Sequence, residues 1–198
     1  MLRIAVDHRV RRVAVSLVFA ILVGVGLPSW QGPTKPARAQ SVEPGDRAAV
    51  LTGLLTALNN GDLDGALALF ADNAVFVGAA RSGGTCSQAT PCTDAAGIRQ
   101  QLQNAVVGSH TCFTLRSLTV SGAVVTGQRD TRNDVTRRNG IDRDIEDFFA
   151  LVPDGQITFW AAVKNVGDPE TALDLAISAG TQPPGTPIPA PGTPCGPV

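Results

Sequence analysis

The chain has 198 residues, of which 43% are hydrophobic and 17% are charged, and its formal net charge is −1. Beyond residue 39 the balance is more acidic, because 10 basic and 16 acidic residues remain there, a net charge of −6. That part has no basic excess to follow a phosphate backbone, which excludes nucleic acid as a partner. It also contains one lysine, Lys164, one histidine, His110, and no tyrosine, so few groups are available for acid–base chemistry.

The N-terminal segment has the pattern of a secretory signal peptide. Four arginines lie in the first twelve residues, and residues 13–27 follow without a charge. As a helix this apolar run spans about 22 Å, less than the roughly 30 Å core of a bilayer. Ala37 and Ala39 then form an A-x-A site, so residues 1–39 are expected to be a signal peptide cleaved after Ala39. An uncleaved anchor is the alternative; after cleavage we expect a secreted or extracytoplasmic protein that is not attached to a membrane.

The rest of the chain divides into one domain and a tail. Seven prolines lie in residues 183–198, which favours extended polyproline II structure over any packed element. We therefore expect a domain over residues 40–178, an ordinary size for a single core, and an extended tail over residues 179–198.

The first half of the domain is predicted to be mostly helical. Apolar residues at helical spacing predict a helix over residues 45–60, followed by a short helix over 63–71 that Asp62 caps. Residues 73–80 have the composition of a strand. A third helix is expected over residues 95–106, capped by Thr93 or Asp94.

The second half is predicted to be a meander of strands. Turn signals at Ser121-Gly122, Asn139-Gly140 and Asp154-Gly155 separate strands expected over residues 110–120, 123–138, 141–152 and 156–163. Three helices followed by antiparallel strands indicate an α+β fold in which the helices cover one face of the sheet.

The Asn139-Gly140 pair predicts a two-residue type I′ turn, which would fix the register of its hairpin and place Arg132 opposite Asp147. One face of the hairpin is then expected to hold Gly127, Arg129, Thr131, Asn133 and Val135 opposite Val152, Ala150, Phe148, Glu146 and Asp144. The other face carries Phe149 and Leu151 among charged residues. We expect a second subunit to cover that face, which makes the protein a homodimer.

Three stretches carry a resemblance to a known family. They are "NNGDLDGALALFADNAVFVG" at residues 59–78, "GIRQQL" at 97–102 and "VPDGQITFW" at 152–160. In this order they resemble the SnoaL-like branch of the NTF2-like superfamily, over about residues 45–165. The resemblance implies a cone-shaped α+β fold, in which a strongly curved antiparallel sheet wraps around the helices and encloses a pocket. It also implies that the outer face of the sheet often forms dimers.

The enzymes of this superfamily have catalytic residues that the chain does not match. Their ketosteroid isomerases place a carboxylate base at the position of Gly78 and use a tyrosine, which the mature chain lacks. Scytalone-dehydratase-like sites use tyrosines and histidines. Proton transfer between carbons needs a base and an electrostatic partner within reach, so the resemblance implies the fold and the pocket without these active sites.

Limonene-epoxide-hydrolase-like enzymes use an Asp-Arg-Asp set, of which only the arginine is matched, by Arg129. Their two aspartates fall at Thr131 and Ala162. A shift of three residues recovers Arg132 with Asp134, but these side chains are expected on the opposite face of the sheet.

Glu146 is the best remaining candidate for a catalytic acid or base. Arg129 is then its partner, or an anchor for an anionic ligand; alternatively the two lie at the pocket rim and neutralise each other. A Glu146 carboxylate buried against Arg129 would favour catalysis. The predicted ligand-binding residues are Arg129, Thr131, Asn133, Glu146, Phe148 and Trp160.

The acids of the segment from Arg129 to Asp147 are not expected to bind a metal. Alternate residues of a strand point to opposite faces, so the acids cannot converge on one ion, and ion pairs with the five arginines of the segment are expected instead. His110 is expected to be a surface or hydrogen-bonded residue. We predict no cofactor, and a non-catalytic module that binds a small, partly apolar molecule or a protein; the alternative is a secreted hydrolase or isomerase with a nonstandard Glu146/Arg129 site.

Four cysteines in an exported chain indicate disulfides before metal binding or redox chemistry. The spacing of Cys86 and Cys92 fits neither a zinc knuckle nor a C-x-x-C motif. We expect Cys86–Cys92 to close a loop and Cys112–Cys195 to hold the tail, while two other connectivities remain open.

Overall fold

The computed structural model describes residues 44–79, 86–189 and 195, so the expected signal peptide lies outside the described residues. The elements in chain order are α1 (Pro44–Asn59), α2 (Leu63–Ala68), β1 (Phe70–Val77), α3 (Ala95–Gln103), a π-helical turn η1 (Asn104–Gly108), β2 (Cys112–Ser121), β3 (Val124–Arg132), α4 (Asp134–Arg138), β4 (Asp144–Leu151), β5 (Ile157–Lys164) and α5 (Pro169–Ser178). In this part of the chain, no helix has the length and apolar character needed to cross a bilayer.

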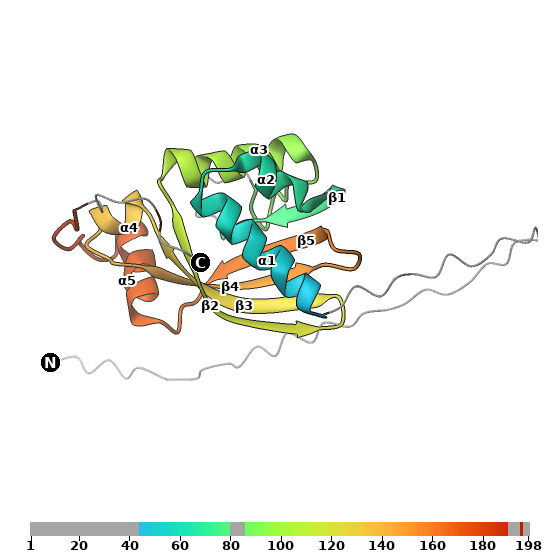
Figure 1. The fold of residues 1–198 in the computed structure, drawn as a ribbon. Helices are drawn as coiled ribbons and strands as arrows, with labels where there is room; N and C mark the ends of the chain where they lie inside the picture. The colour runs from blue at the N-terminus through green and yellow to red at the C-terminus, as the bar shows by residue number, and fades with distance from the viewer. Residues whose placement is uncertain (1–43, 80–85, 190–194, 196–198) are drawn as a thin grey trace, which may run out of the picture. The chain divides into compact units, whose positions relative to one another are not determined.

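Five strands form one curved sheet in the order β1-β5-β4-β3-β2. The pairs from β2 to β5 are antiparallel, and β1 is added at the edge parallel to β5. Helices α1, α2 and α3 gather over one face of the sheet, whereas α4 and α5 lie at one end of it (Figure 1). The predicted α+β fold with helices over one sheet face is confirmed, and so are the predicted caps Asp62 and Asp94.

Helix α1 is the main support of the sheet. Its apolar stripe is fully buried, with at most 2% exposure at Leu51, Leu54, Leu55 and Leu58. The end of α1 is tied to β2 because the Asn59 amide donates to the Phe113 carbonyl (2.7 Å) and accepts from the Phe113 N–H (2.8 Å). These two hydrogen bonds fix the C-terminal end of the helix against the start of β2.

The curvature of the sheet depends on a close approach at Gly127. The β2–β3 register shifts between Leu115 and Ser117, which is a bulge that bends the strand. A Cβ atom at Gly127 would lie 2.1 Å from the Ser117 carbonyl oxygen and 2.6 Å from the Phe148 ring. Only glycine allows these groups to pack so closely, so a side chain here would flatten the sheet.

The prediction of a two-residue hairpin turn at Asn139-Gly140 is wrong. Residues Asp134–Arg138 form α4, and the Asn133 side chain caps its first turn by accepting from the Thr136 N–H (3.0 Å). Asn139 ends the helix, and Gly140 follows with a φ of 74°, the left-handed conformation in which many helices terminate. The Asn-Gly pair is therefore a helix terminus and not a hairpin turn.

Strands β3 and β4 consequently pair four residues away from the predicted register. Arg129 lies opposite Glu146, and Gln128, not Arg132, lies opposite Asp147. Since side chains alternate with a period of two, a shift of four leaves every side chain of the two strands on its predicted face.

Helix α5 is not among the elements expected from the sequence. Its N-cap, Asp168, accepts from the N–H and hydroxyl groups of Thr171 (2.9 and 2.8 Å). The Thr171 hydroxyl oxygen in turn accepts from the Ile145 N–H of β4 (2.8 Å), which attaches the helix to the sheet. The helix ends at Ser178.

Both predicted disulfides are present, Cys86–Cys92 and Cys112–Cys195. Cys92 also forms a β-bridge with Phe76, which attaches the first disulfide loop to β1. The second disulfide holds the tail against the start of β2. Two tail N–H groups, of Gly185 and Ile188, donate to the carbonyls of Asn139 and Arg137 at 2.9 Å.

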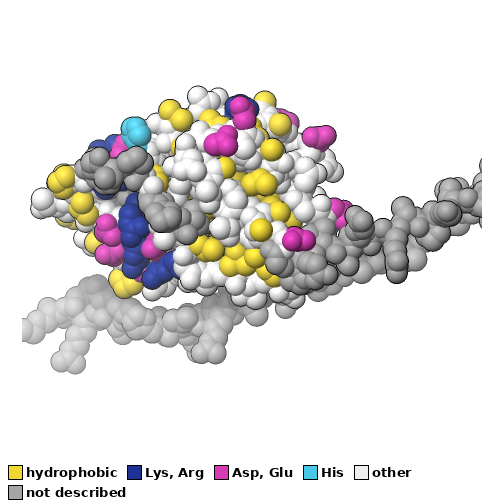
Figure 2. Space-filling view, in the orientation of Figure 1, with side chains coloured by type: hydrophobic (Ala, Val, Ile, Leu, Met, Phe, Trp, Pro, Cys, Tyr) yellow, Lys and Arg dark blue, Asp and Glu magenta, His cyan; other side chains and the backbone are white. Residues whose placement is uncertain are grey.

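On the face shown in Figure 2, the Lys and Arg side chains gather mainly at the end where α4 and α5 lie, beside several acids, while other acids are scattered over the rest of the face. At the end where α4 and α5 lie, the arginines and acids form ion pairs, as predicted for the segment from Arg129 to Asp147. Asp130 lies 3.4–3.8 Å from Arg116, Arg132 and Arg143, and Arg143 also reaches Asp168 of α5 at 3.3 Å. These charges compensate one another, so they form no surface of single sign.

Candidate functional site

A cavity of about 460 Å³ lies between the helices and the inner face of the sheet. Its apolar lining comes from α1, β1, α3 and the central strands. Its polar lining comes from the end of the sheet near α4 and from α3, η1 and the loop that follows. The lining residues are Leu54, Leu58, Phe76, Gly78, Ala79, Gln101, Leu102, Asn104, Ala105, Ser109, Thr111, Phe113, Arg129, Thr131, Asn133, Val135, Thr136, Asp144, Glu146, Trp160, Lys164 and Asp174. This volume can hold a small organic molecule.

Stacked aromatic rings form one wall of the cavity. Trp160, on β5, stacks on Phe76 of β1 with 6.2 Å between ring centroids and on Phe148 of β4 with 5.3 Å. Phe148, predicted as a ligand-binding residue, is not among the lining residues and supports Trp160 from within the core. Trp160 itself is 1% exposed and lines the cavity.

Arg129 crosses the cavity floor between aromatic rings and a carboxylate. Its guanidinium carbon lies 4.2 Å from the Phe113 ring centroid and 5.1 Å from that of Trp160. Its Nε and Nη2 atoms both donate to Oε2 of Glu146, at 3.1 and 2.8 Å. Cation–π contacts and a charge-assisted pair thus fix the side chain in one orientation.

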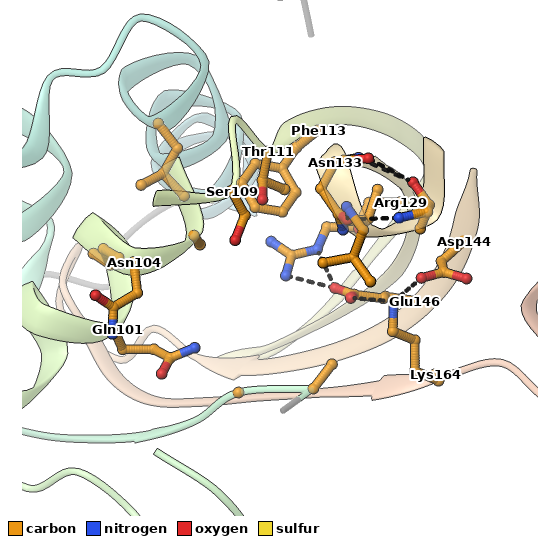
Figure 3. Close-up of a pocket in the computed structure, with 18 of the residues that line it drawn as sticks. Gln101, Asn104, Ser109, Thr111, Phe113, Arg129, Asn133, Asp144, Glu146 and Lys164 are labelled. Atoms are coloured by element: carbon orange, nitrogen blue, oxygen red, sulfur yellow. Dashed lines mark hydrogen bonds and ion pairs between the residues drawn. The ribbon is translucent and has the colours of Figure 1, made fainter. Parts of the chain in front are cut away.

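Lys164, on the neighbouring strand β5, is a second cation that pairs with Glu146. Lys164 forms ion pairs with Asp144 and with Oε1 of Glu146, the latter at 3.3 Å. The charges therefore alternate along one line, from Arg129 through Glu146 and Lys164 to Asp144 (Figure 3). We call these four residues the charge chain. Their side chains are at most 13% exposed.

Glu146 is held in its ionised form. Burial by itself raises the pKa of a carboxyl group, but the positive charges and hydrogen bonds of Arg129 and Lys164 outweigh burial and lower the pKa of Glu146 below its usual value. The carboxylate is thus a stable partner of two cations, not a group poised to exchange a proton.

Among the lining residues, Nε1 of Trp160 and Oγ1 of Thr131 are buried and have no hydrogen-bond partner in the described part of the chain. Both residues are at most 3% exposed. Buried polar groups are nearly always hydrogen-bonded, so these two atoms are exceptions in the described part of the chain.

The structure brings together most of the residues predicted for the site. Arg129, Thr131, Asn133, Glu146 and Trp160 all line the cavity, although the Asn133 side chain is used to cap α4. Arg129 and Glu146 meet in the buried interior and not at an open rim.

The positions matched to family catalytic residues also lie at or near the site. Gly78 lines the cavity without supplying a carboxylate, and Ala162 is buried two residues after Trp160 on the same strand face. His110 lies outside the site, where its ring Nδ1 contacts Asp134 at 2.7 Å.

Lys164 and Asp144 are site residues that the sequence analysis did not single out as candidates. Alternation along the strands could have found them: Lys164 shares its face with Trp160, and Asp144 shares its face with Glu146. The polar residues of the facing helical wall, Gln101, Asn104 and Ser109, had no comparable signal, since they lie in a helix, a π-helical turn and a loop.

Loss of Arg129 is expected to destabilise the protein strongly. Arg129→Met leaves Glu146 buried with only one of its cations, and breaking a buried pair from one side costs roughly 3–5 kcal/mol of unfolding free energy. Arg129→Met/Glu146→Leu should recover most of that loss. Urea denaturation measures both, with Arg116→Met as a control. Arg116 is 37% exposed and Asp130 keeps Arg132 and Arg143 as partners, so this loss should be about 0–1 kcal/mol. An equal loss of unfolding free energy in Arg129→Met and Arg116→Met would contradict the role of the charge chain.

Glu146 should also make stability sensitive to acid. Because its pKa is lowered in the folded state, its contribution is present above the unfolded pKa, for which the ordinary value is 4.5, and is lost as the pH falls below it. Glu146→Gln should flatten the pH dependence of the free energy of unfolding between about pH 5 and 3, relative to the wild-type protein. Superimposable slopes for the two proteins would contradict the lowered pKa.

Comparisons with known proteins find similarity in structure only. No protein-family model matches the chain, and no curated protein matches it significantly. Solved structures that it resembles include Bal32a from a soil-derived mobile gene cassette, with 17% identity, 67% of this chain and 96% of that chain covered, and a TM-score of 0.54. A loop-truncation variant of IdmH has 20% identity, coverage of 65% and 98%, and a TM-score of 0.51.

A third similar structure is an NTF2-like protein of unknown function from Cytophaga hutchinsonii, with 12% identity, coverage of 61% and 91%, and a TM-score of 0.46. At these identities the similarities concern the fold and not the activity. With the order of the elements and the curved sheet over its helices, the similarities to Bal32a and IdmH lead to one conclusion: the chain has the NTF2-like fold.

Proposed function

We propose that the protein is an exported, SnoaL-like binding module whose cavity holds a small, partly apolar molecule without transforming it. The observation that carries the proposal is the cavity of about 460 Å³, with its stacked aromatic wall and its few fixed polar groups. Binding sites for small molecules have this composition, with an apolar lining and a small number of placed polar atoms.

The state of Glu146 supports binding over catalysis. A general base works best when its pKa lies near the operating pH, and Glu146 is shifted in the opposite direction. Both of its oxygens are already in contact with cations, Oε2 with Arg129 and Oε1 with Lys164. Taking up a proton would break these interactions, so the charge chain is better suited to holding the shape of the cavity.

A hydrolase or isomerase remains the second candidate, because the Glu146 carboxylate is buried against Arg129, as an active pair would be. The two functions differ in their response to Glu146→Gln. Once a turnover is found, an enzyme that depends on this carboxylate loses it, whereas undiminished turnover excludes the Glu146 site.

Export is supported by the two disulfides, since such bonds persist in oxidising compartments. We infer that residues 1–39 direct the chain across a membrane and are removed. An exported protein that begins at Gln40 is the expected product, and N-terminal sequencing distinguishes it from a chain that retains the segment.

Binding in the cavity can be tested with N-phenyl-1-naphthylamine, a neutral apolar dye that becomes fluorescent away from water. We expect one site per chain in the wild-type protein and at least tenfold weaker binding in Ala105→Trp, which places an indole among the lining residues. Ala96→Trp is the matched control, because Ala96 is exposed on α3 and does not line the cavity. Equal titrations for all three proteins would place the dye elsewhere and contradict the proposal.

We also propose a homodimer formed through the outer face of the sheet. Phe149 is 37% exposed there, stacks edge-on against Phe159 (5.9 Å), and lies on the same face as Val163, which is 45% exposed. Light scattering at micromolar concentration should give twice the mass of one chain for the wild-type protein and the mass of one chain for Phe149→Lys. A monomeric wild-type protein would contradict this interface.

A further inference from the structure

The indole N–H of Trp160 constrains the chemistry of the ligand. An indole nitrogen donates a hydrogen bond and cannot accept one. Nε1 of Trp160 is buried and has no partner among the described residues, although the ring contacts Phe76, Phe148 and the Arg129 guanidinium. A molecule that satisfies Nε1 must therefore present an acceptor, such as a carbonyl oxygen, at this end of the cavity.

The hydroxyl of Thr131 gives a second constraint at a different place. It is 3% exposed, lines the cavity and also lacks a partner among the described residues. Thr131 of β3 lies opposite Asp144 of β4. Trp160 of β5 lies opposite Ala150, which is six residues further along β4. The two unpaired groups thus lie toward opposite ends of the sheet, with Glu146 between them.

The charges of the site argue against an anionic ligand. Arg129 is already paired with Glu146, to which its Nε and Nη2 atoms donate. Lys164 already contacts two carboxylates. The lining contains two cations, Arg129 and Lys164, and three carboxyl groups, Asp144, Glu146 and Asp174. A ligand carboxylate would enter a buried site with no excess of positive charge, which is costly.

We infer that the cavity selects a neutral, elongated and mostly apolar molecule, with a carbonyl-type acceptor at the Trp160 end and a hydroxyl or carbonyl group at the Thr131 end. The inference rests on the proposed binding function and specifies its ligand class. The aromatic wall supplies the apolar contact, and the two unpaired groups supply orientation, because reversing the molecule would exchange its two polar ends.

Four naphthalenes of similar shape separate these contributions: 2-ethylnaphthalene, 2-acetylnaphthalene, 6-acetyl-2-naphthol and 2-naphthoate. Equilibrium dialysis against the purified protein gives the affinity of each. The acetyl and hydroxyl groups should each improve binding about fivefold, as one net hydrogen bond does, and 2-naphthoate should bind more weakly than 2-acetylnaphthalene. Trp160→Phe should remove the advantage of the acetyl group, and Thr131→Val that of the hydroxyl group, while 2-ethylnaphthalene binds both variants as before.

Thr131→Val also provides a measurement that does not depend on a ligand. Removing a buried hydroxyl without a partner should raise the melting temperature of the empty protein while it weakens binding of 6-acetyl-2-naphthol. A lowered melting temperature would show that the hydroxyl is satisfied within the protein and would overturn its assignment to a ligand.

The outcomes distinguish the inference from the function on which it rests. If all four naphthalenes bind equally well, and Trp160→Phe changes nothing, the ligand class is wrong and the binding function stands. If 2-naphthoate binds most tightly, the neutral class is wrong. If none of the four binds at millimolar concentration, the proposed binding function itself fails.

Discussion

The buried charge chain constrains the rest of the structure. Its four side chains come from three adjacent strands, Arg129 from β3, Asp144 and Glu146 from β4 and Lys164 from β5. Charges removed from water are stable only when they meet partners with good geometry, so any slip between these strands would leave one of them unpaired. The charge chain therefore specifies the register of the central sheet, and the register places the aromatic wall beside the cavity.

This arrangement separates the cavity groups that maintain the fold from the groups that we propose contact a ligand. Arg129 and Glu146 satisfy each other and are buried to more than 90%. Trp160 Nε1 and Thr131 Oγ1 have no partner among the described residues, and they lie one toward each end of the charge chain. Charged residues in a pocket invite a catalytic interpretation, but here the charges pair with one another inside the protein, and the ligand class that we propose relies on neutral hydrogen bonds.

The alternation of side chains along a strand made the faces of β3 and β4 predictable, because a register shift of four residues does not change it. For the same reason the sequence alone places Arg129 and Glu146 on one face of the sheet. The connection between these strands was not predictable in the same way, because Asn-Gly suits a type I′ turn and a helix terminus equally well. Asn133 with Thr136 forms a capping box that favours the helix, and Asp168 followed by Pro169 marks the start of α5. The unpaired polar atoms of the cavity were not predictable either, because they depend on three-dimensional packing and not on the spacing of residues in the sequence.

The replacement of a tight hairpin by α4 has a consequence for how such a protein can diverge. The connection between β3 and β4 contributes Asn133, Val135 and Thr136 to the cavity, but the hydrogen bonds that align the two strands lie outside it. Its cavity-facing side chains can therefore change without altering those hydrogen bonds. On the proposed binding function, proteins built on this plan acquire new ligand preferences through one short segment, while the buried charge pairs of the sheet stay the same.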